Sequence, residues 1–418
     1  MSSYPPSWYA ATANPAPDRP PLEADADCDV VIVGGGFTGL STALALAQAG
    51  RSVRLLEAER VGWGASGRCG GQANPGLRAG PAELEAEVGA EQARRLIGIG
   101  LRVRDGFWDL IARHAIACDA RRGYLLAAAK PRDMAALQGE LATLERLAGP
   151  SRLRLLDAAA VHDAVGSRVH HGGLFDPDGG HVHPLNLALG LATAAEAAGA
   201  IVHERSRVLA IEGSSVRTAH GRVRAAHVVL ATDAWTGDLV PALGHRLMNI
   251  GSYMVATEPL AEGMGVLPQD WAVADTKFVL DYFRRSADGR LIFAGGEKYR
   301  PAEPRDIAAF VRPHAERVFP QLRGIPIAHA WGGQVAITLS RHALVGRQGD
   351  TVYAMGYSGQ GVMLATFMGT LIAEALAGTT RDFETLGALP TPAFPGGGRL
   401  RTPLHVAAML WYALRDRL

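Results

Sequence analysis

Three glycines and one carboxylate stand at the spacing of a dinucleotide-binding site. Gly34, Gly36 and Gly39 form a G-x-G-x-x-G pattern, and Glu57 follows about 20 residues later. In this pattern the first glycine makes a tight turn, the second lets a pyrophosphate approach a helix N-terminus, and the third lets the helix pack on a strand. The carboxylate accepts hydrogen bonds from ribose hydroxyls. These residues predict a dinucleotide site, and they do not separate FAD from NAD.

The segments around these residues supply the context that the motif needs. Residues 30–33 are an apolar, β-branched run, typical of a strand that is buried on both faces. Residues 40–49 have helical composition, Gly50 can end that helix, and residues 52–57 have the composition of a second strand. The sequence therefore predicts a strand, turn, helix and strand unit around the glycines.

A glycine-rich loop follows the carboxylate. Residues 61–76, "VGWGASGRCGGQANPG", contain six glycines in sixteen positions. Such a backbone serves either a tight turn or a main chain that lies flat against a large planar group. The loop resembles the "GASGRNGG" loop of flavoprotein amine oxidases, in the superfamily of D-amino acid oxidase, glycine oxidase and sarcosine oxidase. This resemblance implies that the cofactor is FAD and that the loop lies along the flavin.

The resemblance extends through most of the chain. The stretches "SWYAATANP", "GGHVHPLNLALGLATAAEAAGA", "VVLATDAWT" and "GYSGQGV" occur in the order that they have in the family. Within the family, the chain is most similar to the γ-glutamylputrescine oxidase-like flavoproteins. The resemblance implies an α/β, two-domain flavoprotein, in which a Rossmann-type FAD-binding domain carries an inserted antiparallel-sheet substrate domain.

The order of these stretches predicts the domain boundaries. We expect an extended N-terminal arm at 1–28 and a C-terminal helical tail at 391–418. Three strand-like stretches, "GSYMVATEPL", "KFVLDYFRRS" and "RLIFAGG", predict a sheet that roofs the flavin. The FAD-binding domain is expected to be discontinuous at 29–80, 171–235 and 326–390, and the substrate or cap domain to occupy 81–170 and 236–325.

The resemblance also implies which residues contact FAD. The apolar helix that begins near Gly361 is expected to direct its positive end at the pyrimidine edge of the flavin, where it stabilises the negative charge of the reduced ring. Val208 is expected to offer its backbone to the adenine. The predicted FAD contacts are Gly34, Gly36, Phe37, Thr38, Gly39, Glu57, Ala65, Ser66, Arg68, Cys69, Gly70, Gly71, Gln72, Val208, Ala231, Thr232, Trp235, Gly356, Gly359, Gln360, Gly361 and Val362.

Lys277 and Arg284 are the candidates for substrate contact in the predicted cap. Both are expected to lie on one strand, so that by alternation Lys277, Asp281 and Phe283 face opposite to Tyr282 and Arg284. Sarcosine oxidases of the family use a lysine near the flavin to activate oxygen, which makes Lys277 a candidate for that role. Arg284 is a candidate for holding a remote polar group of the substrate.

Trp331 and Gln334, in the stretch "AHAWGGQVAIT", are further candidate residues of the catalytic site. Glycine and D-amino acid oxidases carry an Arg-Pro pair after the corresponding strand, and its guanidinium grips the α-carboxylate of the substrate. Gln334 and Val335 stand where we align that pair. An amide cannot neutralise a buried carboxylate, so we expect a substrate without a carboxylate beside its amine. Arg68, Arg341 and Arg347 are alternative sources of the missing charge.

Cys69 stands in the flavin loop where many relatives carry asparagine. We interpret it as an ordinary loop residue, and covalent attachment of flavin to its thiol is the alternative. The histidines show no metal-ligand spacing, so no metal is predicted.

The predicted function is oxidation of the C–N bond of a primary or secondary amine, including γ-glutamylated amines, with electrons passed to O2 or another acceptor. Oxidation of a small amino acid (glycine, sarcosine or a D-amino acid) is the alternative. Other classes are an NAD(P)H-dependent flavin hydroxylase and a flavin-fold RNA-modification protein. Against the hydroxylase, no second nucleotide fingerprint is found, and "GYSGQGV" stands in place of a "GDAAH"-like signature.

Composition narrows the partners and the compartment. Lys plus Arg number 42 and Asp plus Glu 41, so charge gives no reason to expect nucleic acid as a partner. Three scattered cysteines are typical of reduced thiols, and the first residues lack the pattern of a signal peptide, so we expect a cytoplasmic protein. The apolar stretch 361–378 contains Glu374, which favours a buried helix over a membrane span. No oligomeric state is predicted.

Overall fold

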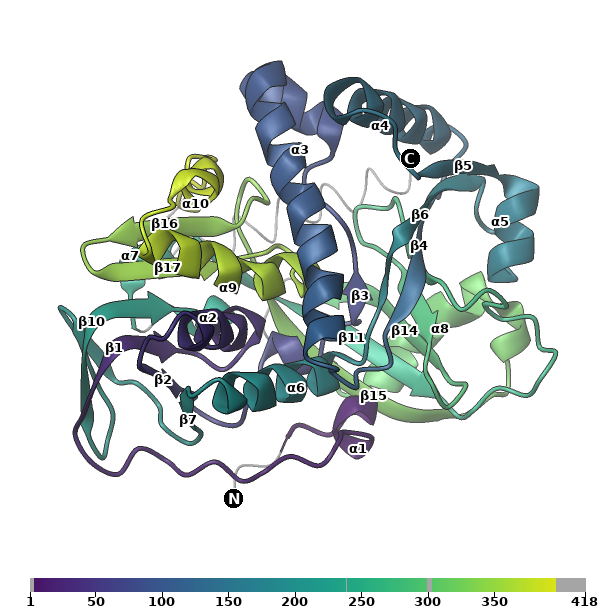
Figure 1. The fold of residues 1–418 in the computed structure, drawn as a ribbon. Helices are drawn as coiled ribbons and strands as arrows, with labels where there is room; N and C mark the ends of the chain where they lie inside the picture. Colours follow the sequence, from purple (N-terminus) through teal and green to yellow (C-terminus); the bar gives the residue numbers. More distant parts are fainter. Residues whose placement is uncertain (1–3, 238, 299–302, 396–418) are drawn as a thin grey trace.

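Two β-sheets organise the chain (Figure 1). The computed structural model describes residues 4–237, 239–298 and 303–395. Most of the predicted C-terminal tail, from residue 396 onward, lies outside the described residues. The α/β fold class predicted from the sequence is confirmed.

The first sheet has eight strands and holds the predicted nucleotide unit. Strands β2, β1, β10 and β17 run parallel, so their carboxyl ends meet at one edge, where ligands of open α/β sheets bind. The hydrogen-bonded order is β16 (Leu344–Gln348), β17 (Thr351–Met355), β10 (Arg222–Leu230), β1 (Ala26–Val33), β2 (Val53–Leu56) and β7 (Ile201–His203), and β8 (Ala210–Glu212) and β9 (Ser215–Arg217) extend from β10.

Helices cover this sheet and bury its apolar side chains. Helix α2 (Phe37–Gln48) packs between α6 (Pro184–Ala197) and α9 (Val362–Leu376) (Figure 1). The approach of α9 to α2 is close, because a Cβ on Gly369 would lie 2.2 Å from the main chain of Ser41. α9 is therefore apolar on almost all sides, as expected of a helix enclosed by protein.

The second sheet has nine strands and is antiparallel except for the pair β12 and β4. One face packs on α8 (Ile307–Val318), and residues on the other face join the core around α2 and α9. Its order is β15 (Ile327–Ile337), β11 (Met248–Thr257), β14 (Leu291–Lys298), β13 (Tyr282–Arg285), β12 (Ala272–Asp275), β4 (Arg121–Ala127), β6 (Gly172–His181) and β3 (Gln72–Ala73), with β5 (Arg154–Asp157) on β6.

The remaining helices lie at the ends and edges of the sheets. α3 is bent at Gly89, where φ is +80°. The other helices are α1 (Trp8–Ala11), α3 (Pro81–Arg113), α4 (Asp133–Ala148), α5 (Ala158–Val165), α7 (Pro241–Gly244) and α10 (Arg381–Gly387), and the 3-10 turns are η1 (Ala65–Gly67), η2 (Asp233–Trp235) and η3 (Pro320–Leu322).

Three strands fall on the other side of the expected boundaries. β3, β6 and β15 lie in stretches assigned to the FAD-binding domain, and all three pair in the second sheet. They do so because β6 has partners on both edges, β4 and β3, and β15 pairs with β11 along its whole length. The second sheet thus contains the predicted cap strands together with strands from stretches that were assigned to the FAD-binding domain.

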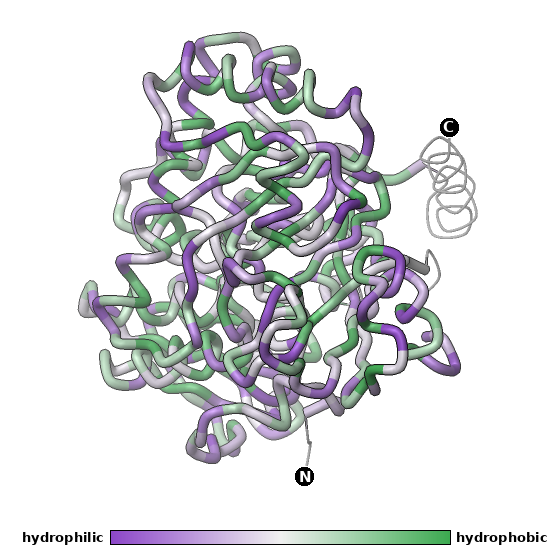
Figure 2. The backbone as a smooth tube through the Cα atoms, turned by 90° about the vertical axis from the view of Figure 1, so that its right-hand side faces the viewer, coloured by the Kyte–Doolittle hydropathy of each residue, from purple (hydrophilic) through white to green (hydrophobic). Residues whose placement is uncertain are grey.

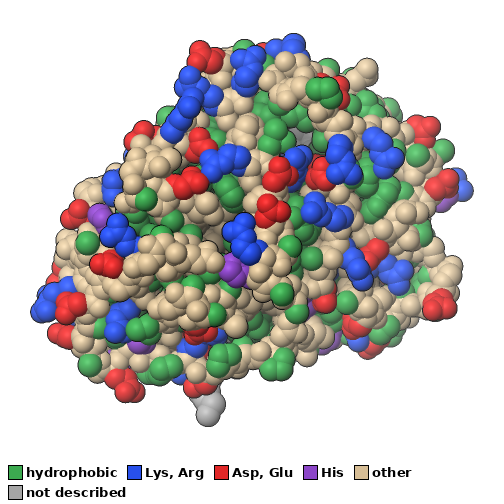
Figure 3. All heavy atoms as spheres, in the orientation of Figure 1, with side chains coloured by type: hydrophobic (Ala, Val, Ile, Leu, Met, Phe, Trp, Pro, Cys, Tyr) green, Lys and Arg blue, Asp and Glu red, His purple; other side chains and the backbone are tan. Residues whose placement is uncertain are grey.

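The outer surface is mixed in polarity and charge. Hydrophobic and hydrophilic residues alternate over short stretches of the backbone (Figure 2). On the face drawn in Figure 3, Lys and Arg side chains are interspersed with Asp and Glu. Within the described ranges, no single helix has the length and hydropathy needed to cross a bilayer, and α9 and α10 reach that threshold only when counted together across a 118° bend.

Candidate functional site

The turn between β1 and α2 forms a cradle at the carboxyl edge of the first sheet. Gly34 has φ of +109°, and a Cβ there would lie 2.5 Å from the carbonyl oxygen of Ala231. A Cβ on Gly39 would lie 1.9 Å from the Gly34 oxygen. A Cβ on Gly36 would lie 2.9 Å from Ser66 Oγ, which accepts a hydrogen bond from the Phe37 N–H at 3.0 Å. The backbone therefore needs Gly34 and Gly39, a side chain at position 36 would displace the Ser66 hydroxyl, and the space before α2 suits an anionic group.

Glu57 stands at the end of β2, beside this turn. Its Oε2 accepts from the Gly35 N–H at 2.6 Å, and its Oε1 accepts from the Glu59 N–H at 2.9 Å. Burial raises the pKa of the Glu57 carboxyl, and these two backbone hydrogen bonds act in the opposite direction. Glu57 thus shapes the glycine turn, at the end of β2 where a ribose contact is predicted.

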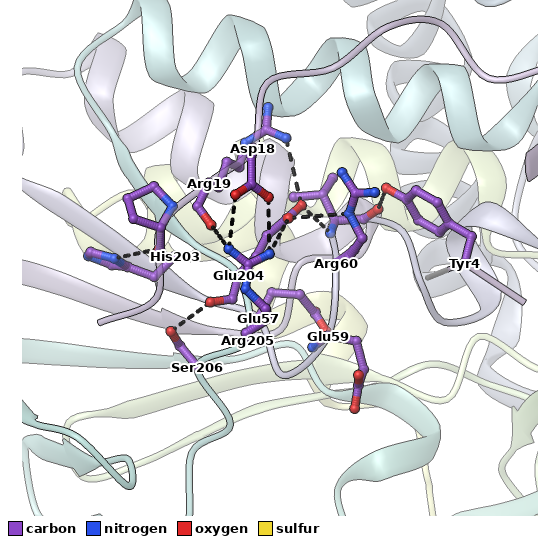
Figure 4. Close-up of polar contacts among 12 residues, drawn as sticks. Tyr4, Asp18, Arg19, Glu57, Glu59, Arg60, His203, Glu204, Arg205 and Ser206 are labelled. Atoms are coloured by element: carbon purple, nitrogen blue, oxygen red, sulfur yellow. Dashed lines mark hydrogen bonds and ion pairs between the residues drawn. The ribbon is translucent and has the colours of Figure 1, made fainter. Parts of the chain in front are cut away.

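A network of charges surrounds this end, and sequence reasoning missed it (Figure 4). The fully buried carboxylate of Glu204, just after β7, has Arg19 at 3.8 Å, Arg60 at 3.4 Å and Arg205 at 3.7 Å. Arg19 also makes two hydrogen bonds to Glu196, at 2.7 and 2.8 Å. The N-terminal arm is thereby fastened beside Glu57.

The glycine-rich loop runs from this turn to the second sheet. A Cβ on Gly70 would lie 2.6 Å from the ring of Tyr282. Gly71 has φ of +69°, and its Cβ would lie 2.1 Å from the carbonyl oxygen of Val182. A Cβ on Gly67 would meet another carbonyl oxygen at 2.1 Å. Close approach to the protein itself therefore explains these glycines in part, beside the planar cofactor that the sequence suggests.

Side chains from the second sheet hold the carbonyl groups of this loop. Trp331 Nε1 donates to the Arg68 oxygen at 3.0 Å, and Arg284 Nε donates to the Gly70 oxygen at 2.8 Å. Gln72 Nε2 donates to the Val273 oxygen at 2.8 Å. The Arg68 guanidinium lies over the ring of Trp63, 4.8 Å from its centroid, and donates to the Gly332 oxygen at 3.2 Å.

The start of α9 lies beside the start of α2. The hydroxyl groups of Thr38 and Tyr357 are 2.6 Å apart, so the segment before α9 touches the first turn of α2. Asp233 Oδ1 accepts from the Gly356 N–H at 2.8 Å. Gln360 Nε2 donates to the oxygens of Pro75 and Leu77 at 3.2 and 2.9 Å, so its amide braces the end of the glycine-rich loop.

Most of the predicted cofactor residues are brought to one edge of the first sheet. The predicted positions within 34–39, 57, 231–232 and 356–362 lie at or beside the carboxyl ends of its strands, and those within 65–72 run from this edge to β3 of the second sheet. Trp235, in η2, has its ring centroid 5.9 Å from that of Trp63. Val208 lies two residues after Ser206, whose N–H donates to the backbone carbonyl oxygen of Glu57 at 2.8 Å. A cradle for an anion, a carboxylate at one end and a loop at the other fit an elongated dinucleotide such as FAD.

Lys277 lies on the side of the sheet that alternation predicted, opposite to Tyr282, but in a loop and not on a strand. Residues 276–281 form a loop, and β13 begins only at Tyr282. Lys277 Nζ pairs with Asp281 Oδ2 at 2.6 Å and with the buried Asp275, and Asp281 also meets Arg317 of α8 at 2.7 Å. Two buried carboxylates need a cation, so Lys277 is drawn to them. This group lies on the α8 side of the sheet, whereas Tyr282 packs on the opposite side, against the flavin loop.

Three further candidates lie closer to the loop. Arg284 is 2% exposed, and its Nε, Nη1 and Nη2 donate to Gly70 O, Arg285 O and Tyr9 Oη, so it is placed to hold the loop rather than a substrate. Trp331 is also buried, and its indole N–H holds the loop by donating to the Arg68 carbonyl oxygen. Gln334 is partly buried, and its Oε1 accepts from Asn249 Nδ2 at 3.3 Å.

Cys69 is enclosed by the loop that bears it. Burial raises the pKa of its thiol, although a hydrogen bond from the Gly71 backbone opposes this. A protonated thiol is a poor nucleophile, so we expect FAD to be held without a covalent bond.

Acid precipitation tests this prediction. We expect the yellow colour to stay in solution when the protein is precipitated, and Cys69→Ser to keep the flavin content of the wild-type protein. Colour that pellets with the wild-type protein but not with Cys69→Ser would show a thioether bond.

Asp233 is a residue of the site that the sequence did not mark. Its φ is +43°, a conformation that Asp and Asn tolerate better than other side chains. Burial raises its pKa to about 6, while backbone hydrogen bonds from Gly356 and Ala234 oppose the shift. Folding raises this pKa from the ordinary value of 3.8, so burying the charged carboxylate lowers the stability of the folded protein. The loss of stability is complete above about pH 6 and absent below pH 3.8, where the carboxyl is protonated in both states.

Replacing Asp233 by asparagine is therefore expected to stabilise the apoprotein at high pH. The amide oxygen still accepts from Gly356, and the buried charge is gone, so the gain is about 1–3 kcal/mol at pH 8 and fades toward pH 4. Thermal unfolding of both proteins across this range measures it. Asp288 is the matched control: burial acts to raise its pKa, but hydrogen bonds from Ser286 and Arg290 lower it overall, so Asp288→Asn should destabilise at pH 8. A Tm difference for Asp233→Asn that does not depend on pH would contradict the assignment.

Comparison with known proteins agrees with this geometry. The family model described as FAD dependent oxidoreductase matches residues 29–375. The chain is 40% identical over 425 residues to gamma-glutamylputrescine oxidoreductase of Escherichia coli (strain K12), and the aligned region covers 100% of this chain and 100% of that protein. It is 37% identical to the probable oxidoreductase OrdL of Rhizobium meliloti (strain 1021), over 98% of this chain and 97% of that protein. Among solved structures, glycine oxidase from Geobacillus kaustophilus has a TM-score of 0.71 at 19% identity, over 84% of this chain and 95% of that one, which is a likeness of fold.

Proposed function

The chain belongs to the FAD dependent oxidoreductase family, and from this premise we propose that its substrate is an amine with no carboxylate beside the nitrogen. The protein is an FAD-dependent oxidoreductase that oxidises the C–N bond of amines. A terminal or N-alkyl amine fits the proposal, and so does a γ-glutamylated diamine. The name of the relative at 40% identity, gamma-glutamylputrescine oxidoreductase, supports the second of these.

Gln334 is the observation that carries the proposal. It lies on β15, and its amide is bonded to Asn249. We align this position with the arginine that grips the carboxylate in amino acid oxidases of the family. Arg68 and Arg284, the guanidinium groups at the loop, are engaged with backbone oxygens. Arg341 lies over the ring of Phe278, 5.5 Å from its centroid, and Arg347 is exposed on β16, in the first sheet. A substrate carboxylate in a dry pocket without a cation costs several kcal/mol, so such substrates should bind poorly.

The residues of the chain bind and orient the amine and exclude water from it. When bound, FAD supplies the two-electron acceptor for the hydride of the carbon that bears the nitrogen. An alkylamine has a pKa of ~10.4 in water, so an apolar pocket that disfavours the ammonium form helps to present the free lone pair. Water then hydrolyses the imine to a carbonyl compound. We propose O2, reduced to H2O2, or another electron acceptor as the final oxidant.

A comparison of kcat/KM tests the substrate class. An alkylamine or a γ-glutamylated diamine is expected to exceed glycine, sarcosine and D-alanine by about tenfold or more. Gln334→Ala should change this ratio, because it alters a side chain of the proposed amine site. The matched control is Gln321→Ala, which removes an exposed amide that donates to the Gly166 oxygen, and it should leave the ratio unchanged. A free α-amino acid that is preferred about tenfold would contradict the proposal and assign the carboxylate to an arginine.

A further inference from the structure

The first helix of the chain packs against side chains that hold the glycine-rich loop of residues 61–76, the predicted flavin loop. In α1, Trp8 is 2% exposed and Tyr9 is fully buried, and Ser7 Oγ caps the helix by accepting from the Ala10 N–H at 3.0 Å. The Tyr9 ring lies 5.2 Å from the ring of Trp331 and 5.0 Å from that of His183. α1 thus lies beside β15 and α6, although it precedes residue 29, where the family match begins (Figure 1).

Arg284 connects Tyr9 to the loop. Its Nη2 donates to Tyr9 Oη at 3.1 Å and its Nε donates to the Gly70 oxygen at 2.8 Å. Among the residues that the structure describes, no carboxylate lies within ion-pair distance of this guanidinium. Burial raises the pKa of Tyr9 to about 12, so the phenol is neutral at physiological pH and does not balance the charge. A buried cation without a counter-charge is costly, so Arg284 depends on its hydrogen bonds to the Gly70, Arg285 and Tyr9 oxygens.

Trp331 makes a second connection from Tyr9 to the same loop. It stacks edge-on with Tyr9, and its indole N–H donates to the Arg68 oxygen at 3.0 Å. Two carbonyl groups of the loop, at residues 68 and 70, are therefore held by side chains that both contact Tyr9. The loop is also held at Gly71, whose carbonyl oxygen accepts from the Val182 N–H at 2.8 Å.

We propose that Tyr9 is a positioning residue for the cofactor: through Arg284 and Trp331 it fixes the flavin loop in the shape that binds FAD. The N-terminal arm is then part of the cofactor site. This inference goes beyond the proposed function, since it depends on FAD binding and on no property of the substrate.

The arm offers a control that does not contact the loop. Asn14 Nδ2 donates to the Ala117 oxygen at 2.7 Å, so Asn14→Ala removes one side-chain hydrogen bond of the arm, as Tyr9→Phe does, without touching Arg284, Trp331 or residues 61–76. Docking of the arm in general is tested by Asn14→Ala, and the connection through Arg284 is tested by Tyr9→Phe.

The experiment uses the full-length apoprotein and free FAD, with no amine present, so its outcome is separate from that of the substrate assay. FAD affinity is measured by quenching of FAD fluorescence, the environment of the bound ring by visible circular dichroism, and stability by the Tm of the apoprotein. For Tyr9→Phe and Arg284→Gln we expect FAD affinity to fall about tenfold, with a changed dichroism spectrum. Arg284→Lys should recover part of the loss, because it keeps the charge and one donor.

Asn14→Ala is expected to keep the affinity and the spectrum of the wild-type protein, whatever its Tm. The proposal is overturned if Tyr9→Phe binds FAD within about twofold of the wild-type protein with an unchanged spectrum, or if Asn14→Ala weakens binding equally. If Arg284→Gln does not fold, Tyr9→Phe decides, because it keeps the ring and its stacking.

Discussion

Gly36→Val is expected to give a folded protein that is purified without FAD. Gly36 precedes the first turn of α2, and a Cβ there would lie 2.9 Å from Ser66 Oγ, the acceptor for the Phe37 N–H. Valine displaces this hydroxyl and fills the space before the helix N-terminus, where the pyrophosphate approaches. The loss of FAD affinity should be about 100-fold or more, since both shape and donor groups are lost.

The flavin-to-protein absorbance ratio after purification, and the dissociation constant after adding FAD back, measure this effect. Gly98→Ala is the matched control, because Gly98 lies within α3 and a Cβ there meets no atom within 4 Å. The control should keep its flavin and gain slightly in stability. Wild-type flavin content in Gly36→Val would contradict the placement of the pyrophosphate.

Glu57→Ala is expected to weaken FAD binding by about 10- to 100-fold without changing the reactivity of the flavin that is still bound. The carboxylate accepts from Gly35 at 2.6 Å and from Glu59 at 2.9 Å, so its loss removes both a support of the turn and the predicted ribose contact. It lies at the opposite end of the site from the loop held by Arg284 and Trp331, so the reacting ring is not disturbed.

Titration of the apoprotein with FAD gives the affinity, and the rate of anaerobic reduction at saturating FAD gives the reactivity. Glu59→Ala is the matched control, since that side chain pairs with Arg207 at 2.8 Å rather than with the glycine turn. Unchanged affinity in Glu57→Ala would refute the ribose role, and a changed reduction rate would place Glu57 near the ring.

The part of the site that could be predicted from the sequence is the part that is local in the chain. The strand, turn, helix and strand from β1 to β2 form as expected, because the pattern of Val30–Val33, the three glycines and Glu57 lies within one short segment. The resemblance to the family extended this prediction to α9 and to the glycine-rich loop. Such motifs carry their own physical reason, which is backbone shape.

The features that escaped prediction depend on partners far away in the sequence. Tyr9 meets Arg284, 275 residues later, and Asp233 meets Gly356, 123 residues later. Lys277 was predicted to lie on a strand because its stretch alternates like one, whereas it lies in the loop between β12 and β13, where it pairs with Asp275 and Asp281. Pairing between strands decides these contacts, and no local pattern records it.

Anaerobic reduction of the purified protein tests the central claim most directly. The account predicts a yellow protein whose flavin absorbance bleaches when an alkylamine or a γ-glutamylated diamine is added without oxygen, and does not bleach with NADPH. Readmission of oxygen, or addition of another electron acceptor, should restore the colour. A protein that binds no flavin, or a flavin that NADPH bleaches and no amine does, would contradict the account.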